Sequence, residues 1–384
     1  MHKWISFFFI LFIKSQLQYD HGFIEPSPLF YWLFPNNSTN TLIIWLEGGP
    51  GCSFLSDVFM DNGPFRINDQ FQPSGYPYGW NLVGNLLYID QPIGTGFSQS
   101  KQYRTSEVQI AKDLLGFFDS FFKKYPMFDG ADIYFTGHSY AGHYIAGALP
   151  YLLQANPYIF RNVKGVLIGD PLISATAKYQ SMPEFVKNHG LLESKFQYFT
   201  SKIGGWLCGK LIQYGAYNLA RNYCELMSII LVGIKPRFNT GDISNTFINY
   251  TNYNHYIPTL MAKLNLPYIG CNPEVKTQLR KDYYTDFDDG LKYLLERMPV
   301  VLFYGENDYI DSWESGELLI DGIYPNRDKI IFDWKTYNQT YGYYYRHLNL
   351  TMLHVSNAGH TVILYQPEFT FQMIARFILS SKHN

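Results

Sequence analysis

Short apolar segments that alternate with longer amphipathic ones constrain the fold of this chain more than any other feature. The short runs are five or six residues long, contain β-branched or aromatic side chains and end at turn-forming residues, as expected of buried strands. They are residues 29–34, 41–46, 85–90, 132–136, 163–168, 299–304 and 352–356. Helical spacing of apolar residues occurs at 105–125, 140–154 and 369–380. Because buried strands that alternate with helices form parallel sheets covered on both faces, we predict an α/β fold.

The alternation stops in the middle of the chain. After about residue 178 the pattern indicates helices and loops, and strand-like runs return only near residue 299. We therefore predict a core formed by residues 19–178 and 296–384, with residues 179–295 inserted as a mostly helical cap. A chain of 384 residues is long enough for one large domain with such an insertion.

The first 18 residues resemble a secretory signal peptide. His2 and Lys3 form a basic start, and an apolar run of ten residues follows from Trp4 to Ile13. Ten residues are too few to span a bilayer, which needs about 20. We expect this segment to be removed, and the mature protein to lie in an oxidising compartment without membrane insertion.

The cysteine count fits an oxidising compartment. Four cysteines form an even set without the spacing of metal ligands, so we expect two disulfides. Their spacing alone leaves three pairings open. Five N-glycosylation sequons point to the same compartment; they begin at Asn36, Asn37, Asn249, Asn338 and Asn349.

Charge argues against nucleic acid as a partner. The formal net charge is −2, and no cluster of lysine and arginine exceeds a pair. Hydrophobic residues make up 47% of the chain and charged residues 16%, which is typical of a globular protein.

A candidate nucleophile lies between a predicted strand and a predicted helix. Residues 137–142 read G-H-S-Y-A-G, which has the pattern of a nucleophile elbow with Ser139 at its centre. The glycines permit the tight turn that lifts a serine side chain out at the top of a sheet, and Ala141 takes the place of the usual second glycine. The sequence therefore predicts covalent chemistry at Ser139, without a metal or cofactor.

Serine needs a base and a carboxylate that orients the base. His360 follows the predicted strand 352–356, whereas His354 lies within it, so we predict His360 as the base. The acid is expected after the strand 299–304, where Glu306, Asp308 and Asp311 are all candidates.

An oxyanion also needs backbone donors. One is the N–H that follows the nucleophile, from Tyr140, and the other is expected from the glycine-rich loop at 47–52. That loop lacks the glycine and lysine spacing of nucleotide-binding motifs, so nucleotide binding is excluded.

Several blocks of the chain, in order, resemble the serine carboxypeptidase family. Residues 45–53 read W-L-E-G-G-P-G-C-S, where the family has W-L-N-G-G-P-G-C-S, and Asn62, Gly63 and Pro64 resemble its E-N-G-P block. Residues 90–98 resemble its D-Q-P-x-G-T-G-F-S. The segments 137–142, 305–308 and 359–367 resemble its blocks around the nucleophile, the acid and the histidine.

This resemblance implies an α/β-hydrolase fold with an inserted cap, and it ranks the candidates. It implies a triad of Ser139, Asp308 and His360, with the N–H groups of Gly49 and Tyr140 as oxyanion donors. It also implies disulfides that join Cys52 to Cys271 and Cys208 to Cys224. Asp311 stands where some members of the family carry a cysteine.

The chain departs from the family where the substrate's terminal carboxylate is expected to bind. Glu47, Asp61 and His138 replace an asparagine and two glutamates, with Gly48 in the same loop. Because histidine has an ordinary pKa of about 6.5, we hypothesise that a cationic His138 attracts the carboxylate at acidic pH.

The resemblance thus predicts a serine-type carboxypeptidase that forms an acyl-enzyme on peptide C-termini at acidic pH, with no cofactor. A homodimer is compatible with it, as is a lysosome-like or vacuole-like lumen or secretion. The changed carboxylate site leaves two alternatives, an esterase or acyltransferase and a non-catalytic binding protein.

Overall fold

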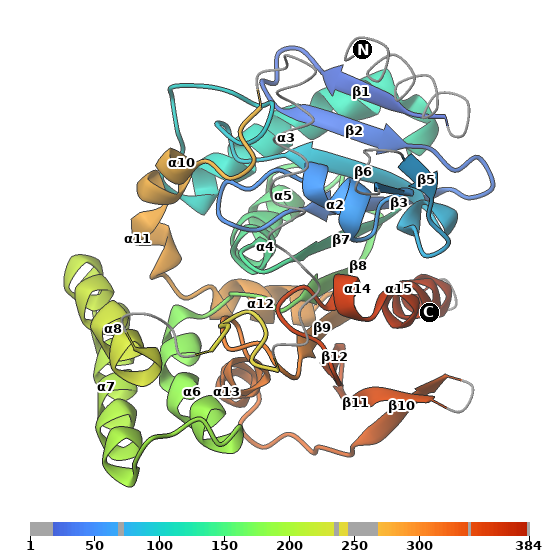
Figure 1. Ribbon diagram of the computed structural model, residues 1–384. Helices are drawn as coiled ribbons and strands as arrows, with labels where there is room; N and C mark the ends of the chain where they lie inside the picture. Colours follow the sequence, from blue (N-terminus) through green and yellow to red (C-terminus); the bar gives the residue numbers. More distant parts are fainter. Residues whose placement is uncertain (1–17, 68–72, 234–237, 245–267, 337–338, 382–384) are drawn as a thin grey trace, which may run out of the picture.

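A ten-stranded sheet runs through the protein (Figure 1). The computed structural model describes residues 18–67, 73–233, 238–244, 268–336 and 339–381. The strands of the sheet are β1 (Asp20–Phe23), β2 (Phe30–Phe34), β3 (Thr41–Leu46), β6 (Asn85–Asp90), β7 (Asp132–His138), β8 (Val163–Gly169), β9 (Val300–Gly305), β10 (Phe332–Thr336), β11 (Gln339–His347) and β12 (Leu350–Val355). A separate hairpin pairs β4 (Phe65–Ile67) with β5 (Pro73–Gly75).

The order of the strands is β1-β2-β6-β3-β7-β8-β9-β12-β11-β10. From β6 to β12 the strands run parallel. This part confirms the predicted α/β-hydrolase sheet. The edges differ from the prediction, because β1 and β2 at one edge and β10 and β11 at the other are antiparallel. Hairpin connections need no helix between strands, so the alternation of strand and helix could not reveal β1, β10 or β11.

Helices lie on both faces of the sheet, and further helices form the cap (Figure 1). They are α2 (Leu55–Met60), α3 (Glu107–Lys124), α4 (Ala141–His143), the π-helical η3 (Tyr144–Ala148), α5 (Leu149–Ala155), α6 (Ala175–Asn188), α7 (Lys195–Gln213), α8 (Tyr217–Val232), α10 (Pro273–Gln278), α11 (Arg280–Tyr283), α12 (Asp288–Leu295), α13 (Trp313–Ile323), α14 (Val362–Tyr365) and α15 (Pro367–Ser381). The described residues also form two 3₁₀ turns, η1 (Trp80–Leu82) and η2 (Pro126–Phe128).

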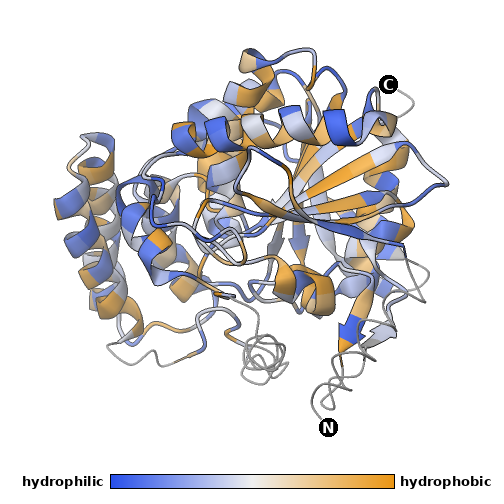
Figure 2. Ribbon diagram, turned by 90° about the horizontal axis from the view of Figure 1, so that it is seen from above, coloured by the Kyte–Doolittle hydropathy of each residue, from blue (hydrophilic) through white to orange (hydrophobic). Residues whose placement is uncertain are grey.

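The parallel strands are apolar on both sides because each face carries its own core. Successive residues of β3 point into different cores, one on each face of the sheet. Leu42 and Ile44 pack with α3, α5 and α12, whereas Ile43 and Trp45 pack with α2 and α15. A strand buried on both faces has no polar side, which explains the continuous apolar runs in the sequence. Figure 2 shows these strands as the apolar centre of the molecule.

The cap has a hydrophobic cluster of its own. Side chains of α6, α7 and α8 pack around the disulfide between Cys208 and Cys224, and α7 and α8 lie side by side away from the sheet (Figure 1). The cap boundaries remain a proposal. Helix α6 crosses the boundary predicted at residue 178, and α12 packs into the main core through Leu291 and Leu294.

Several predicted features can be located only in part. The signal segment lies outside the described residues except for Gln18, and so do Asn249 and Asn338. Asn37 is exposed, whereas the amides of Asn36 and Asn349 donate hydrogen bonds to backbone carbonyls. Glycosylation therefore stays a prediction. No helix within the described ranges combines the length and apolarity needed to cross a membrane.

Candidate active site

Ser139 lies on a sharp turn between β7 and α4. Its φ of 58° places it in the left-handed region, which non-glycine residues rarely adopt. Its N–H donates to the carbonyl of Gly169 on β8, and its carbonyl accepts from Gly142 at the start of the next helix. The turn is thus held from both sides, as a nucleophile elbow requires.

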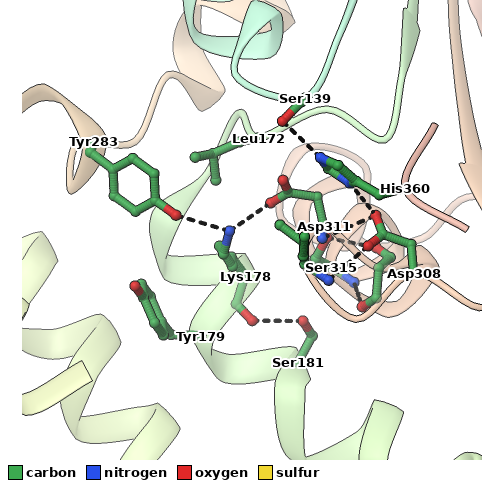
Figure 3. A network of polar contacts seen from close by, with 12 residues as sticks. Ser139, Leu172, Lys178, Tyr179, Ser181, Tyr283, Asp308, Asp311, Ser315 and His360 are labelled. Atoms are coloured by element: carbon green, nitrogen blue, oxygen red, sulfur yellow. Dashed lines mark hydrogen bonds and ion pairs between the residues drawn. The ribbon is translucent and has the colours of Figure 1, made fainter. Parts of the chain in front are cut away.

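Ser139, His360 and Asp308 form a continuous hydrogen-bonded chain (Figure 3). Ser139 Oγ lies 2.9 Å from His360 Nε2, and His360 Nδ1 lies 2.7 Å from Asp308 Oδ2. Asp308 is fully buried and also accepts from the N–H groups of Ile310 and Asp311. Burial by itself lowers the pKa of His360, but the Asp308 carboxylate outweighs this effect and the pKa is raised.

The other candidates from the sequence have different surroundings. Glu306 accepts a hydrogen bond from the N–H of Asn357, and Asp311 pairs with Lys178. His354 lies within β12, where its ring stacks on Tyr343 at 4.4 Å between centroids. Of the three acids, Asp308 is the one that His360 contacts.

The glycine-rich loop packs directly on the elbow. A Cβ on Gly48 would lie 2.9 Å from both Ser139 Cβ and Tyr140 N, so a side chain cannot fit there. Gly49 follows with a φ of 114°. Within the described residues, the N–H groups of Gly49 and Tyr140 donate to no backbone carbonyl, which leaves both available for an oxyanion.

A disulfide fixes this loop. Cys52 is bonded to Cys271, and the backbones of the two residues pair beside it. The N–H of Gly51 also donates to the hydroxyl of Tyr144. Both pairings implied by the resemblance are therefore present, the second being Cys208 with Cys224.

Three buried carboxyl groups lie beside the elbow. Asp57 hydrogen-bonds with both Glu47 and Asp61, and Trp45 Nε1 donates to it at 2.9 Å. Burial and mutual repulsion raise the pKa of Glu47 to about 8 and the pKa values of Asp57 and Asp61 well above normal. The cluster therefore holds protons at acidic and neutral pH.

Asp57 was missed by sequence reasoning. It lies on α2, is almost fully buried and comes from a segment that reads as apolar. Its position four residues before Asp61, one helical turn away, is the signal that could have found it.

His138 differs from its predicted state. Burial and, to a smaller extent, the nearby His360 lower its pKa to about 4, although Asp61 and other acids act in the opposite direction. The hypothesis of a cationic His138 at mildly acidic pH is therefore disfavoured in the free protein. Its Nδ1 lies 3.0 Å from Glu47 Oε2, although the groups are not aligned for a hydrogen bond.

These residues open into one cavity of about 530 Å³. The strand order gives it two sides. Glu47 follows β3 on one side of β7, and Leu172 and Lys178 follow β8 on the other. Within the described ranges, no group of three or more histidine, cysteine or acidic side chains is arranged to hold a metal ion.

Known proteins resemble this chain along most of its length. The family model for serine carboxypeptidase matches residues 19–204 and 240–380. Serine carboxypeptidase S10 family member 1 of Dictyostelium discoideum is 30% identical over 374 residues, which cover 91% of this chain and 89% of the relative. Serine carboxypeptidase 3 of Oryza sativa subsp. japonica is 29% identical, over 91% of this chain and 76% of its own length.

A solved structure shows the same fold. Kex1Δp, a prohormone-processing carboxypeptidase from Saccharomyces cerevisiae, superposes with a TM-score of 0.79 at 24% sequence identity. The match covers 95% of this chain and 91% of that one.

Proposed function

The chain belongs to the serine carboxypeptidase family and is a serine-type carboxypeptidase, and on that premise we propose that Ser139 is its nucleophile. Ser139 Oγ attacks the last peptide carbonyl of the substrate while His360 takes its proton. The oxyanion that forms binds the N–H groups of Gly49 and Tyr140. His360 then gives the proton to the departing amine, which leaves an acyl-enzyme on Ser139.

Water completes the cycle by the same route. His360 removes a proton from water, which attacks the acyl carbonyl, and the proton returns to Ser139 as the acid product leaves. Asp308 accepts from His360 Nδ1 throughout, so it keeps Nε2 directed at Ser139 and stabilises the cationic ring.

The buried carboxyl cluster is the observation that carries the substrate assignment. Glu47 and Asp61 line the cavity beside Ser139, and their raised pKa values keep them protonated in acid. Protonated carboxyl groups donate hydrogen bonds to a terminal carboxylate, whereas ionised ones repel it. We therefore assign Glu47, Asp61 and neutral His138, with the Gly48 backbone, to carboxylate binding at acidic pH.

The disulfides, together with the proposed binding of a carboxylate by protonated carboxyl groups, support an acidic lumen of the secretory pathway, or secretion, as the place of action. Peptide C-termini are the proposed substrates.

Blocked dipeptides that end in a free acid or in an amide test this proposal. We expect the ratio of kcat/KM for the acid over the amide to be at least tenfold higher at about pH 4.5 than at pH 8, because Glu47 ionises near pH 8 whereas the titration of His360 affects both substrates equally. Equal turnover of acid and amide at every pH would contradict carboxylate recognition and favour an esterase or acyltransferase.

A further inference from the structure

A buried ion pair lies in the same cavity, on the other side of Ser139 from the carboxyl cluster. Lys178 Nζ on α6 lies 3.0 Å from Asp311 Oδ1 and 3.1 Å from the hydroxyl of Tyr283 on α11 (Figure 3). The side chains of Lys178 and Asp311 are only 6% and 2% exposed. All three residues line the cavity.

Such a pair needs an explanation beyond stability. Burying two charges costs solvation energy that their attraction often only balances, so apolar residues of similar size serve packing as well or better. Within the described residues, neither side chain of the pair hydrogen-bonds to Ser139 or His360. Its place in the wall of the cavity therefore suggests a role toward the substrate.

The strand order places this pair on the acyl side. In a substrate whose terminal carboxylate lies at the cluster after β3, the last residue fills that side of β7. The scissile carbonyl lies at Ser139, so the chain before it continues toward β8 and β9. Lys178 follows β8 and Asp311 follows β9, where the side chain of the penultimate residue would lie.

The unused donors and acceptors of Lys178, Asp311 and Tyr283 indicate which chemical group could bind there. An ammonium has three protons, and the described residues accept two of them from Lys178. Tyr283 accepts from Lys178, so its own proton is available. Asp311 has acceptor capacity beyond its bond to Lys178. Two donors beside one acceptor match a carboxamide, whose oxygen accepts and whose NH₂ donates.

We propose that Lys178, Asp311 and Tyr283 form a subsite for a side-chain amide, so that the enzyme favours glutamine as the penultimate residue of its substrates. This inference rests on the proposed carboxypeptidase function. A free carboxylate fits less well because the Asp311 carboxylate lies in the same part of the cavity wall.

Three blocked dipeptides test the proposal, Gln-Leu, Met-Leu and Gly-Leu, with kcat/KM measured at one acidic pH. Glutamine and methionine are close in size, so their ratio isolates the amide. We expect wild type to favour Gln-Leu over Met-Leu at least fivefold. The double variant Lys178→Met/Asp311→Leu removes both charges together and should lower that ratio at least tenfold, with Gly-Leu hydrolysis nearly unchanged.

Lys276→Met is the matched control, since Lys276 is an exposed lysine of the same cavity on α10. It should leave the ratio unchanged. Tyr283→Phe removes one hydroxyl and should lower the Gln-Leu to Met-Leu ratio about threefold. This variant tests the subsite if the double variant does not fold.

The outcomes separate the two claims. Failure of wild type to cleave any of the three dipeptides would overturn the proposed function itself. Cleavage of Gly-Leu with an unchanged Gln/Met ratio in Tyr283→Phe and the double variant would overturn the subsite. Equal losses on all three substrates would also overturn it, because they would indicate a structural role alone.

Discussion

Individual side chains in this site owe their charge to burial more than to their type. Glu47 and His138 look like a carboxylate and a cation in the sequence, yet burial raises the pKa of Glu47 to about 8 and lowers that of His138 to about 4. Both are therefore neutral between those values. The sequence predicted which residues meet at the site. Their protonation depends on how deeply they are buried and on the neighbouring Asp57, which belongs to no recognised motif.

Replacing Glu47 with glutamine tests this protonation. The pKa of Glu47 is raised, so its carboxyl group is a donor below about pH 8 and a repelling charge above it. Glutamine keeps a donor at every pH. We expect the alkaline fall of kcat/KM on an acid-ended dipeptide to move to higher pH in Glu47→Gln. Glu274→Gln, at an exposed position on α10, is the control. If the alkaline fall of kcat/KM stays at the same pH in Glu47→Gln, the proposed role of Glu47 is refuted.

Gly48 tests the contact between the loop and the elbow. In Gly48→Ala the new Cβ would lie 2.9 Å from Tyr140 N and Ser139 Cβ, so the oxyanion site must shift. We expect kcat/KM to fall about 100-fold or more, the size of losing one oxyanion donor. Gly116→Ala is the matched control, because its Cβ meets nothing within 4 Å. Wild-type activity in Gly48→Ala would contradict the packing.

Between elements, the two disulfides have different tasks. Cys208 and Cys224 join α7 to α8 within the cap cluster, across a separation of 16 residues. Cys52 and Cys271 instead join the loop before α2 to the segment before α10, beside the proposed oxyanion donors. The first bond is expected to stabilise the cap and the second to hold the catalytic loop.

Paired substitutions separate these tasks. Cys208→Ala/Cys224→Ala should lower the free energy of unfolding by about 3 kcal/mol, the value for a loop of roughly 15 residues. Limited proteolysis should then cut within α7 or α8 while activity is largely kept. Cys52→Ala/Cys271→Ala should lower kcat more than tenfold. If removal of the Cys208–Cys224 disulfide lowers activity and removal of the Cys52–Cys271 disulfide does not, the proposed assignment is wrong.

The strands and helices that position the site were largely predictable. β3 and β6 begin and end at the predicted residues, because both lie in the fully buried centre of the sheet. β11 was not predicted, since its sequence is polar and aromatic and it pairs only with neighbours in antiparallel hairpins. The amide subsite was also beyond reach, because Lys178 and Asp311 are 133 positions apart and meet only in the fold.

At the scale of the molecule, the buried acids of the described residues favour an acidic environment. Their pKa values are raised, chiefly by burial, in Glu47, Asp57, Asp61, Asp90, Glu107, Asp170, Asp282 and Asp288. A raised carboxyl pKa means that stability is complete below about pH 4 and is lost as pH rises through the folded value. Buried His138 and His143, with pKa values of about 4, act in the opposite sense below pH 6.5.

Since the acids outnumber the histidines, we expect the melting temperature to fall between pH 5 and pH 8. Glu107 and Asp282 form one buried acid pair between α3 and α11. Glu107→Gln removes one ionisation and should raise the melting temperature at pH 8 by about 2–4 °C, with little change at pH 5. Glu296→Gln, at an exposed position, should change the melting temperature at neither pH. A melting temperature that rises toward pH 8 in wild type would contradict this account.

Labelling with a fluorophosphonate, followed by intact mass and peptide mapping, tests whether Ser139 is the nucleophile of the carboxypeptidase. We predict one label per folded chain, located on Ser139, with hydrolysis of an acid-ended blocked dipeptide lost in proportion to labelling. Ser139→Ala should take no label and lose at least about 10⁴-fold in kcat. Label on another residue, or activity that survives complete labelling or the Ser139→Ala substitution, would contradict the assignment.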